Sequence, residues 1–310
     1  MKKILSFAGS CVIAAALASS GLTANINQSA GTTSGEFLRI GAGARPAGMG
    51  EAYAAMASDV YSLYWNPAGL AQVRSSEILM AHTMWYLDVS HEYVAYVRPL
   101  GGNKGAVGVS VTYLMTTFEK RNGDTEAADS SGNVGDMAVG VSYGRTLIGG
   151  IGGGITAKYI SSKLDTYNAS AMAFDVGFKK ALPFWNEKIT AGLAISNLGG
   201  SLKYIANPVA IGTIADLGLA SKNVYKNLSL ALDVRTVLNG NSDPSFNAGG
   251  EYVFKCTDQI TLSPRFGFMT GGSRLTAGFG FSWEGYQLDY AFSPHADLGT
   301  SNRISLSAKF

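Results

Sequence analysis

The chain has 310 residues, of which 15% are charged and 46% hydrophobic, and it contains 39 glycines but only 8 prolines. Soluble domains carry about 25% charged residues, so this composition is unusual for a soluble globule. The formal net charge is +2 and no basic patch is present, which excludes nucleic acid as an expected partner.

Residues 1–24 have the pattern of a secretory signal peptide. Lys2 and Lys3 precede an apolar stretch from Ile4 to Leu17, and the following "SSGLTA" ends in a small residue suitable for cleavage. A membrane anchor would need about 20 apolar residues, which the serines and glycines of this stretch interrupt. We therefore expect cleavage after Ala24.

Removal of this segment changes two properties of the mature chain. Cys11 leaves with it, so Cys256 is the only remaining cysteine and an intramolecular disulfide is excluded. Lys2 and Lys3 also leave, and the net charge of the mature chain falls to about zero.

The rest of the chain predicts a transmembrane β-barrel. It contains no run of about 20 apolar residues for a membrane helix, yet it is apolar and rich in glycine and tyrosine. Apolar and small residues alternate in segments such as "VGVSVTYLM" and "LTAGFGFSW", and aromatic residues gather at segment ends. A soluble β-sandwich also alternates, but segments of about nine to eleven residues and aromatic girdles favour the barrel.

Counting these segments predicts an antiparallel barrel of about 14 strands, with even strand number as in bacterial barrels. An even count returns both mature termini to the periplasmic side of the outer membrane, with the longer loops outside. The expected strands are 75–85, 91–100, 104–117, 134–147, 151–163, 169–180, 188–198, 208–220, 225–237, 244–254, 258–270, 273–283, 285–293 and 301–310.

The last segment, "RISLSAKF", places apolar residues on one face and ends the chain on an aromatic residue. This resembles the C-terminal signal through which the barrel-insertion machinery recognises outer-membrane barrels. The residues that carry the resemblance are Ile304, Leu306, Ala308 and Phe310.

The inward face of the predicted barrel combines small residues with scattered charges of both signs. An unpaired buried charge is costly, so we expect these charges to form ion pairs and hydrogen bonds. The lumen also needs a filling element, because a barrel this wide is not closed by its own side chains. The predicted lumen charges are Lys158, Asp175, Asp233, Arg235, Glu251, Arg265 and Asp289.

Sequence patterns for enzymatic chemistry are weak. His82, His91 and His295 lack Glu or Cys at metal-ligand spacing, so we expect no metal site. "GAGARPAGMG" has Pro46 where a dinucleotide fingerprint needs its third glycine, and no parallel strand precedes it. We expect no catalytic residue and no cofactor.

Residues 25–72 do not alternate, and we predict a plug (hatch) between the signal peptide and the barrel of residues 73–310. Met49, Tyr53, Met56 and Val60 have the spacing of one helix face. Asn66 precedes a proline and is therefore expected to be extended, with its side chain bonding the backbone two residues on. The predicted plug motif comprises Tyr64, Trp65, Asn66, Pro67, Ala68 and Gly69. We expect this segment to enter the barrel from the periplasmic end, although an independent periplasmic unit or a covering strand remains an alternative.

"GARPAGMGEAY" (43–53) and "LYWNPAGL" (63–70), followed by the predicted strands, resemble the PorV/PorQ family of outer-membrane proteins. That family is itself similar to the FadL-type transporters of long-chain fatty acids and other hydrophobic compounds. In FadL-type proteins the motif matched by Asn66, Pro67 and Ala68 lies in an N-terminal hatch that plugs the lumen. The resemblance to PorV implies a part in type IX secretion, in which exported cargo is carried to an attachment complex at the cell surface.

Two functions follow from this resemblance. In the first, the barrel is a non-enzymatic secretion component that binds exported proteins or secretion components through outer loops near 122–129 and 297–302. In the second, it is a passive transporter of hydrophobic small molecules, with the plug gating the lumen. An apolar pocket that is lined by plug aromatics and opens sideways through the wall would favour transport. A filled, charge-paired lumen with an apolar rim on the outer loops would favour the partner role.

Overall fold

The computed structural model describes residues 32–124, 126–183, 189–240, 242–270, 275–295 and 298–310. The predicted signal peptide lies outside these residues. No helix among the described residues is long and apolar enough to cross a membrane.

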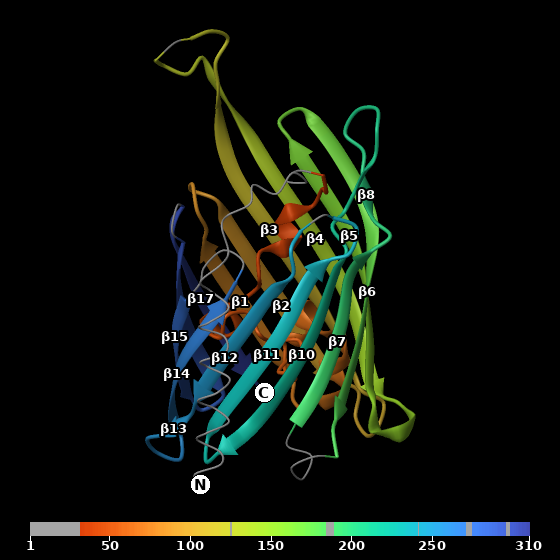
Figure 1. The fold of residues 1–310 in the computed structure, drawn as a ribbon, viewed down its shortest axis with the longest axis vertical. Helices are drawn as coiled ribbons and strands as arrows, with labels where there is room; N and C mark the ends of the chain where they lie inside the picture. Colours follow the sequence, from red (N-terminus) through yellow and green to blue (C-terminus); the bar gives the residue numbers. More distant parts are fainter. Residues whose placement is uncertain (1–31, 125, 184–188, 241, 271–274, 296–297) are drawn as a thin grey trace.

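The molecule is a closed antiparallel barrel of fourteen strands that surrounds the N-terminal segment (Figure 1). Neighbouring strands follow chain order, β1 pairs with β17, and pairing of β12 with β14 completes the circle. Two-residue β13 continues the line of β12 beyond Val253, and β8 and β9 form a small separate hairpin. The barrel strands are β1 (Glu77–Met84), β2 (Ser90–Pro99), β3 (Ala106–Lys120), β4 (Ser130–Thr146), β5 (Gly152–Leu164), β6 (Tyr167–Ala181), β7 (Ile189–Leu198), β10 (Ile214–Tyr225), β11 (Leu228–Val237), β12 (Ser245–Tyr252), β14 (Ile260–Met269), β15 (Leu275–Trp283), β16 (Tyr286–His295) and β17 (Gly299–Lys309). The short elements are β8 (Ser201–Leu202), β9 (Val209–Ala210), β13 (Phe254–Lys255) and the 3₁₀ turn η4 (Ile148–Gly150).

The predicted barrel and its strand number are confirmed, and each predicted segment overlaps one barrel strand. The largest difference is in β10, which begins at Ile214 rather than at 208, because the preceding residues form β9 and a turn. The inward and outward faces also follow the predicted alternation. In β3, Val107, Val109 and Val111 are exposed on the outside, whereas Ser110 and Thr112 are buried on the inside.

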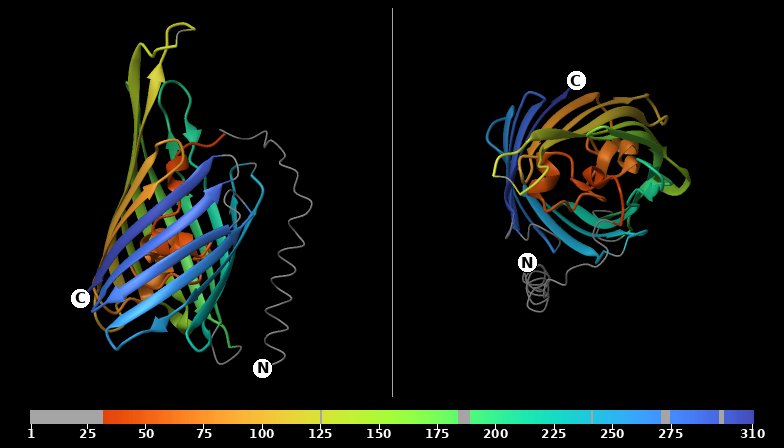
Figure 2. Two further views of the ribbon diagram at one scale, coloured as in Figure 1. Left: turned by 90° about the vertical axis from the view of Figure 1, so that its left-hand side faces the viewer. Right: turned by 90° about the horizontal axis from the view of Figure 1, so that it is seen from above.

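The two ends of the barrel differ. The β3–β4 hairpin rises well beyond the neighbouring strands at one end, here called the upper end, and the chain's C terminus lies at the lower end (Figures 1 and 2). The hairpin projects because β2 stops at Ser90, opposite Met115, and β5 stops at Leu164, opposite Val134. Its last residues therefore pair only with each other.

Residues 32–72 run through the lumen and are called the plug (Figure 2). The plug contains only short helical elements, namely η2 (Glu36–Arg39), α2 (Ala44–Gly48), α3 (Ser62–Trp65) and η3 (Pro67–Gln72). At the upper end Ser34 forms a parallel bridge with Ile211, and at the lower end the chain leaves the lumen to begin β1.

This path corrects the expectation that the plug enters from the same end as the C terminus. The described chain begins at the upper end, opposite Phe310. The N–H of Ser34 donates to the carbonyl of Ala210 at 2.9 Å, which fixes the first described residues beside the β9–β10 connection. Leu38 and Phe37 are buried in the same upper part of the lumen.

The predicted helix through Met49, Tyr53, Met56 and Val60 is wrong. Helix α2 ends at Gly48, and Gly50 and Glu51 have φ values of 61° and 58°, which a right-handed helix excludes. Wall side chains take backbone donors that a helix would use, since Thr276 accepts from the N–H of Gly50 at 3.1 Å and Asp233 from that of Ala54 at 2.7 Å. All four predicted residues are buried, because the barrel surrounds the plug on every side.

Candidate functional site: the plugged lumen

Asn66 begins the turn that holds the lower part of the plug. Its backbone is extended (φ −165°, ψ 106°), as expected for a residue before proline. Its side-chain oxygen accepts from the N–H of Ala68 at 3.1 Å, and its amide group donates to the carbonyl of Ala54 at 2.8 Å. The side chain is fully buried, so both bonds are shielded from water.

The turn residues Pro67 and Ala68 lie against glycines of the barrel wall, whereas Gly69 lies against Ala57 and Ser62 of the plug. A Cβ atom added to Gly154 would overlap with the carbonyl group of Pro67, and one added to Gly177 would overlap with the side-chain oxygen of Asn66. The wall glycines therefore let the plug backbone approach the strands more closely than any other residue would.

Tyr64 and Trp65 connect the turn to the upper part of the plug. The Tyr64 hydroxyl lies 2.8 Å from the carbonyl oxygens of Leu38 and Ile40, and the Trp65 indole N–H donates to the carbonyl of Ala42 at 3.0 Å. Burial raises the pKa of Tyr64 above its ordinary value, so its hydroxyl stays protonated and can donate. These aromatic residues hold the plug's own backbone in place.

The predicted lumen charges all face inward, and six of them form or extend ion pairs. Around Arg265, Nε lies 2.6 Å from Glu251 and Nη1 lies 2.7 Å from Asp289. Arg45 of the plug joins this group through Glu251 at 2.7 Å, and it also pairs with Asp59 within the plug at 3.0 Å. The wall and the plug are thus connected by charge at this level of the lumen.

A second group is centred on Glu51 of the plug. Its carboxylate pairs with Arg303 at 2.8 Å and with Arg235 at 3.0 Å, and Arg235 also pairs with Asp216 at 2.7 Å. Desolvation by burial tends to raise the pKa of Glu51, but the attraction of Arg303 and Arg235 outweighs it and lowers the pKa. Glu51 is therefore held as a carboxylate.

The remaining predicted charges lie elsewhere on the same inner face. Lys158 pairs with Asp175 at 2.7 Å, and Asp233 accepts the plug N–H of Ala54. Arg45, Glu51, Asp216 and Arg303 were not predicted. Asp216 and Arg303 lie on the inward phase of alternating segments, so the pattern that located the others could also have located these two.

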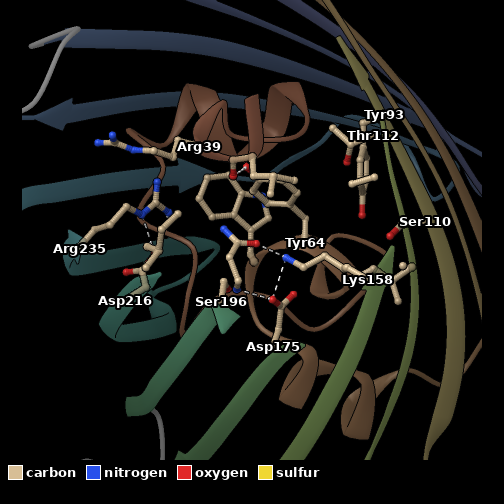
Figure 3. A pocket seen from close by; sticks show the side chains of 17 residues that line it. Arg39, Tyr64, Tyr93, Ser110, Thr112, Lys158, Asp175, Ser196, Asp216 and Arg235 are labelled. Atoms are coloured by element: carbon tan, nitrogen blue, oxygen red, sulfur yellow. Dashed lines mark hydrogen bonds and ion pairs between the residues drawn. The ribbon is translucent and has the colours of Figure 1, made fainter. Parts of the chain in front are cut away.

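The upper cavity of the lumen is small, and its lining combines apolar, polar and charged side chains (Figure 3). Its volume is about 50 Å³, and it is bordered by the plug aromatics Tyr64 and Trp65 and by charged residues of the wall. Two buried polar atoms that border it, the Tyr93 hydroxyl and one oxygen of Asp216, have no hydrogen-bond partner among the described residues. Its size and these two unpaired polar atoms suit a few water molecules.

A lower cavity of about 190 Å³ lies where the plug leaves the lumen. Its lining includes both ends of two ion pairs, Arg45–Asp59 and Lys309–Glu77. Both cavities therefore combine apolar and charged side chains in their linings, and a hydrophobic ligand in either one would lie against ion pairs. Within the described parts of the chain, no group of three or more His, Cys, Asp or Glu side chains is placed to hold a metal ion.

Two predicted surfaces lie outside the lumen. Ile304, Leu306 and Phe310 of the C-terminal segment face outward and are exposed, with Ala308 partly exposed. The predicted outer-loop region 122–129 forms the tip of the β3–β4 hairpin, with Thr125 outside the described residues, and Asp297 of the second region also lies outside them.

The fold is shared with solved outer-membrane transporters. The toluene transporter TbuX of Ralstonia pickettii is 13% identical with a TM-score of 0.56, and the match covers 87% of this chain and 98% of TbuX. The monoaromatic hydrocarbon channel CymD is 10% identical with a TM-score of 0.62, with 87% and 98% covered. A FadL homologue of Pseudomonas aeruginosa is 11% identical with a TM-score of 0.57, with 86% and 98% covered. At such identities the likeness is one of fold.

No curated protein matches the chain. The family model described as "Type IX secretion system protein PorV" matches residues 23–227. Because this match spans more than half of the chain, the protein belongs to the PorV family.

Proposed function

We propose that this protein is a non-enzymatic component of protein secretion and surface attachment of the type IX kind, and that it binds exported partners at its upper end. Membership of the PorV family supports the secretion role. The projecting β3–β4 hairpin and the tip at 122–129 supply a surface for such partners beyond the barrel rim.

The observation that carries the proposal is the filled, charge-paired lumen. The upper cavity measures about 50 Å³ and is lined by Lys158, Asp175 and Arg235. The lower cavity, of about 190 Å³, is lined by the ion pairs Arg45–Asp59 and Lys309–Glu77, whereas an engineered cavity of about 150 Å³ that binds benzene is lined by apolar side chains. A hydrophobic solute would have to displace the plug, and this would break the ion pairs of Glu51 and Arg45.

The proposal includes an arrangement in the outer membrane. Residues 1–24 are removed as a signal peptide, residues 25–72 form the plug and residues 73–310 form the barrel inserted by the barrel-insertion machinery. The lower end, with Phe310, faces the periplasm, and the upper end faces the cell exterior. The outward apolar face contacts outer-membrane lipid.

A pull-down from native membranes, paired with an uptake assay for a labelled fatty acid, tests the proposal against passive transport. We expect the tagged protein to recover secretion components or exported proteins, and we expect uptake to be unchanged when the gene is deleted. A variant lacking residues 121–129 should insert normally but recover less partner. Recovery of no secretion component, together with reduced uptake in the deletion strain, would favour the transporter.

A further inference from the structure

The projecting β3–β4 hairpin leaves the edge of β3 open above the barrel rim (Figures 1 and 2). Pairing of β3 with β2 ends where Met115 lies opposite Ser90, whereas pairing of β3 with β4 continues to Lys120 opposite Ser130. Among the described residues, no backbone hydrogen bond reaches residues 116–120 from the β2 side. This open side of residues 116–120 is called the β3 edge below.

The opposite edge of the hairpin is more nearly covered. β5 pairs with β4 as far as Val134, and the N–H of Asp165 in the β5–β6 turn donates to the carbonyl of Asn133 at 2.8 Å. The carboxylate of Asp165 also pairs with the ammonium group of Lys120 at 2.5 Å. Residues 130–132 alone extend beyond this turn on β4, so the longer free edge belongs to β3.

Side-chain contacts hold the hairpin in shape above the rim. The ring of Phe118 covers Gly132 on the neighbouring strand and leaves no room for a Cβ atom there. The Lys120 ammonium group lies 6.0 Å from the centre of the same ring, and the β3–β4 register runs without a shift from Ala106 to Lys120. A partner would therefore meet an edge that is already ordered, which keeps the entropic cost of binding low.

The β3 edge lacks the features that normally protect edge strands. Native edges carry charges, prolines or bulges that prevent pairing with other chains. Thr116, Thr117 and Phe118 are uncharged, favour strands and follow one another without a bulge. The two charged residues that follow them form ion pairs with neighbours. The edge is thus open to pairing with another strand.

An extended backbone matches this edge. Alternate residues of 116–120 turn their N–H and C=O groups away from β4, and an extended strand presents complementary groups at the same spacing. Antiparallel pairing is the more stable kind, and it would place the added strand in line with β2, running towards the barrel. The lower end of that strand would reach the β1–β2 turn, where Leu87 is 80% exposed and offers an apolar contact.

A second copy of this chain fits the β3 edge less well. In one membrane, β3 of every copy rises in the same direction, so two β3 edges would pair in the less stable parallel arrangement. β4 of another copy runs the opposite way, but it leaves only residues 130–132 free. The edge therefore favours a strand from a different protein.

We propose that the β3 edge binds an extended segment of an exported protein, which adds antiparallel to residues 116–120 and continues the line of β2 above the rim. This inference rests on the proposed role in secretion, and it names how the partner at the upper end is bound. Phe118, which is 38% exposed, and Leu87 favour apolar side chains in the segment. Because most of the hydrogen bonds go to the backbone, segments of different sequence can bind the same edge.

Photocrosslinking in the native organism tests the pairing and its direction. A photoreactive residue replaces Thr117 or Glu119, which lie on the same face of β3, or the exposed Tyr167 at the upper end of β6 as the control. We expect the first two probes to crosslink one segment of an exported protein at least tenfold more than the control. In an antiparallel pair, the crosslink from position 119 should lie about two residues nearer the N terminus of that segment than the crosslink from position 117.

A variant that covers the edge with its own chain isolates strand addition from other contacts. Four alternating Thr and Val residues are inserted on each side of Leu87–Asp88, which lengthens the β1–β2 hairpin so that β2 itself pairs with the β3 edge. The matched control carries the same insertions around Asp165–Thr166 in the β5–β6 turn, which add equal bulk at the rim and leave the β3 edge open. We expect the first variant to lose the crosslink and the recovery of the exported protein at least tenfold, and the control to keep both within twofold.

Heat-modifiable mobility on gels shows whether each variant forms the barrel, and the crosslink register decides the question where one does not. Crosslinks that do not shift with the probe, that reach only another copy of this chain, or that disappear equally in both insertion variants would overturn the inference. If the covered variant still recovers the exported protein while removal of residues 121–129 abolishes recovery, the secretion role stands and strand addition fails. If the unmodified protein recovers no exported protein or secretion component, the proposed function itself fails.

Discussion

The carbonyl group of Pro67 in the plug lies directly against the α-carbon of Gly154 in β5. A Cβ atom at Gly154 would overlap with the carbonyl carbon and oxygen of Pro67 and lie 2.6 Å from the nitrogen of Ala68. Similar close approaches place Gly249 and Gly267 against Met49 and Gly50. The plug and the wall therefore fit through backbone contacts that side chains would prevent.

Gly154→Ala should displace the plug. The added methyl group meets backbone atoms, which cannot rotate away, so we expect a loss of about 1–3 kcal/mol in the free energy of unfolding. Gly135→Ala is the matched control, because its Cβ would meet only the Tyr113 hydroxyl, at an ordinary 3.6 Å. Thermal unfolding followed by heat-modifiable mobility measures the difference, and equal midpoints for the two variants would contradict the close fit.

Asn66→Ala should open the lumen to ions. The substitution leaves the carbonyl of Ala54 and the N–H of Ala68 without their side-chain partner in a fully buried place. We expect the free energy of unfolding to fall by about 1–3 kcal/mol. Replacing Asn66 and Pro67 together should raise single-channel conductance in planar bilayers above that of the unmodified protein. Unchanged conductance would mean that this motif does not keep the lumen closed.

Much of this architecture can be predicted from the sequence, for reasons that particular residues illustrate. In the wall, each residue must face either lumen or membrane, so alternation assigns Asp233 and Arg235 to the inside without any knowledge of their partners. In the plug, every direction is buried, so the spacing of Met49, Tyr53, Met56 and Val60 carries no information about a helix. The partners of Glu51 and Arg45 lie about two hundred residues away, and no local pattern predicts such pairs.

Glu51→Gln should weaken the plug and remove part of its acid sensitivity. Removing the carboxylate leaves Arg235 and Arg303 without one buried anion. We expect this to lower the free energy of unfolding by about 3–5 kcal/mol. Because the folded state lowers the pKa of Glu51, its stabilisation is fully present above the unfolded pKa of about 4.3 and is lost as the pH falls through the lower folded value. Unfolding midpoints between pH 7 and pH 3 should fall less in the variant. Glu36→Gln, which alters an exposed pair with Arg39, serves as the control and should change stability by less than about 1 kcal/mol.

Cysteine labelling should establish which end faces the cell exterior. Cys256 is exposed in the turn between β13 and β14 at the lower end, and it is the only cysteine after residue 24. In intact cells a membrane-impermeant maleimide should not label it, whereas C256S/N122C, with its cysteine at the tip of the β3–β4 hairpin, should be labelled. Disruption of the outer membrane should make Cys256 reactive. The reverse pattern would place the lower end outside.

Deletion of Phe310 should impair assembly more than stability. Phe310 is 72% exposed on the outward face, and the centroid of its ring lies 6.4 Å from that of Tyr96. Beyond two backbone hydrogen bonds with Ser76, few contacts of the folded barrel depend on it. If the insertion machinery recognises the C-terminal residues, the amount of barrel in the outer membrane should fall several-fold. The thermal unfolding midpoint of the protein that does insert should change by only a few degrees. Tyr96→Leu, which removes the same ring contact but keeps the C terminus, should insert at normal levels. Equal losses of inserted barrel in both variants would assign Phe310 a packing role instead.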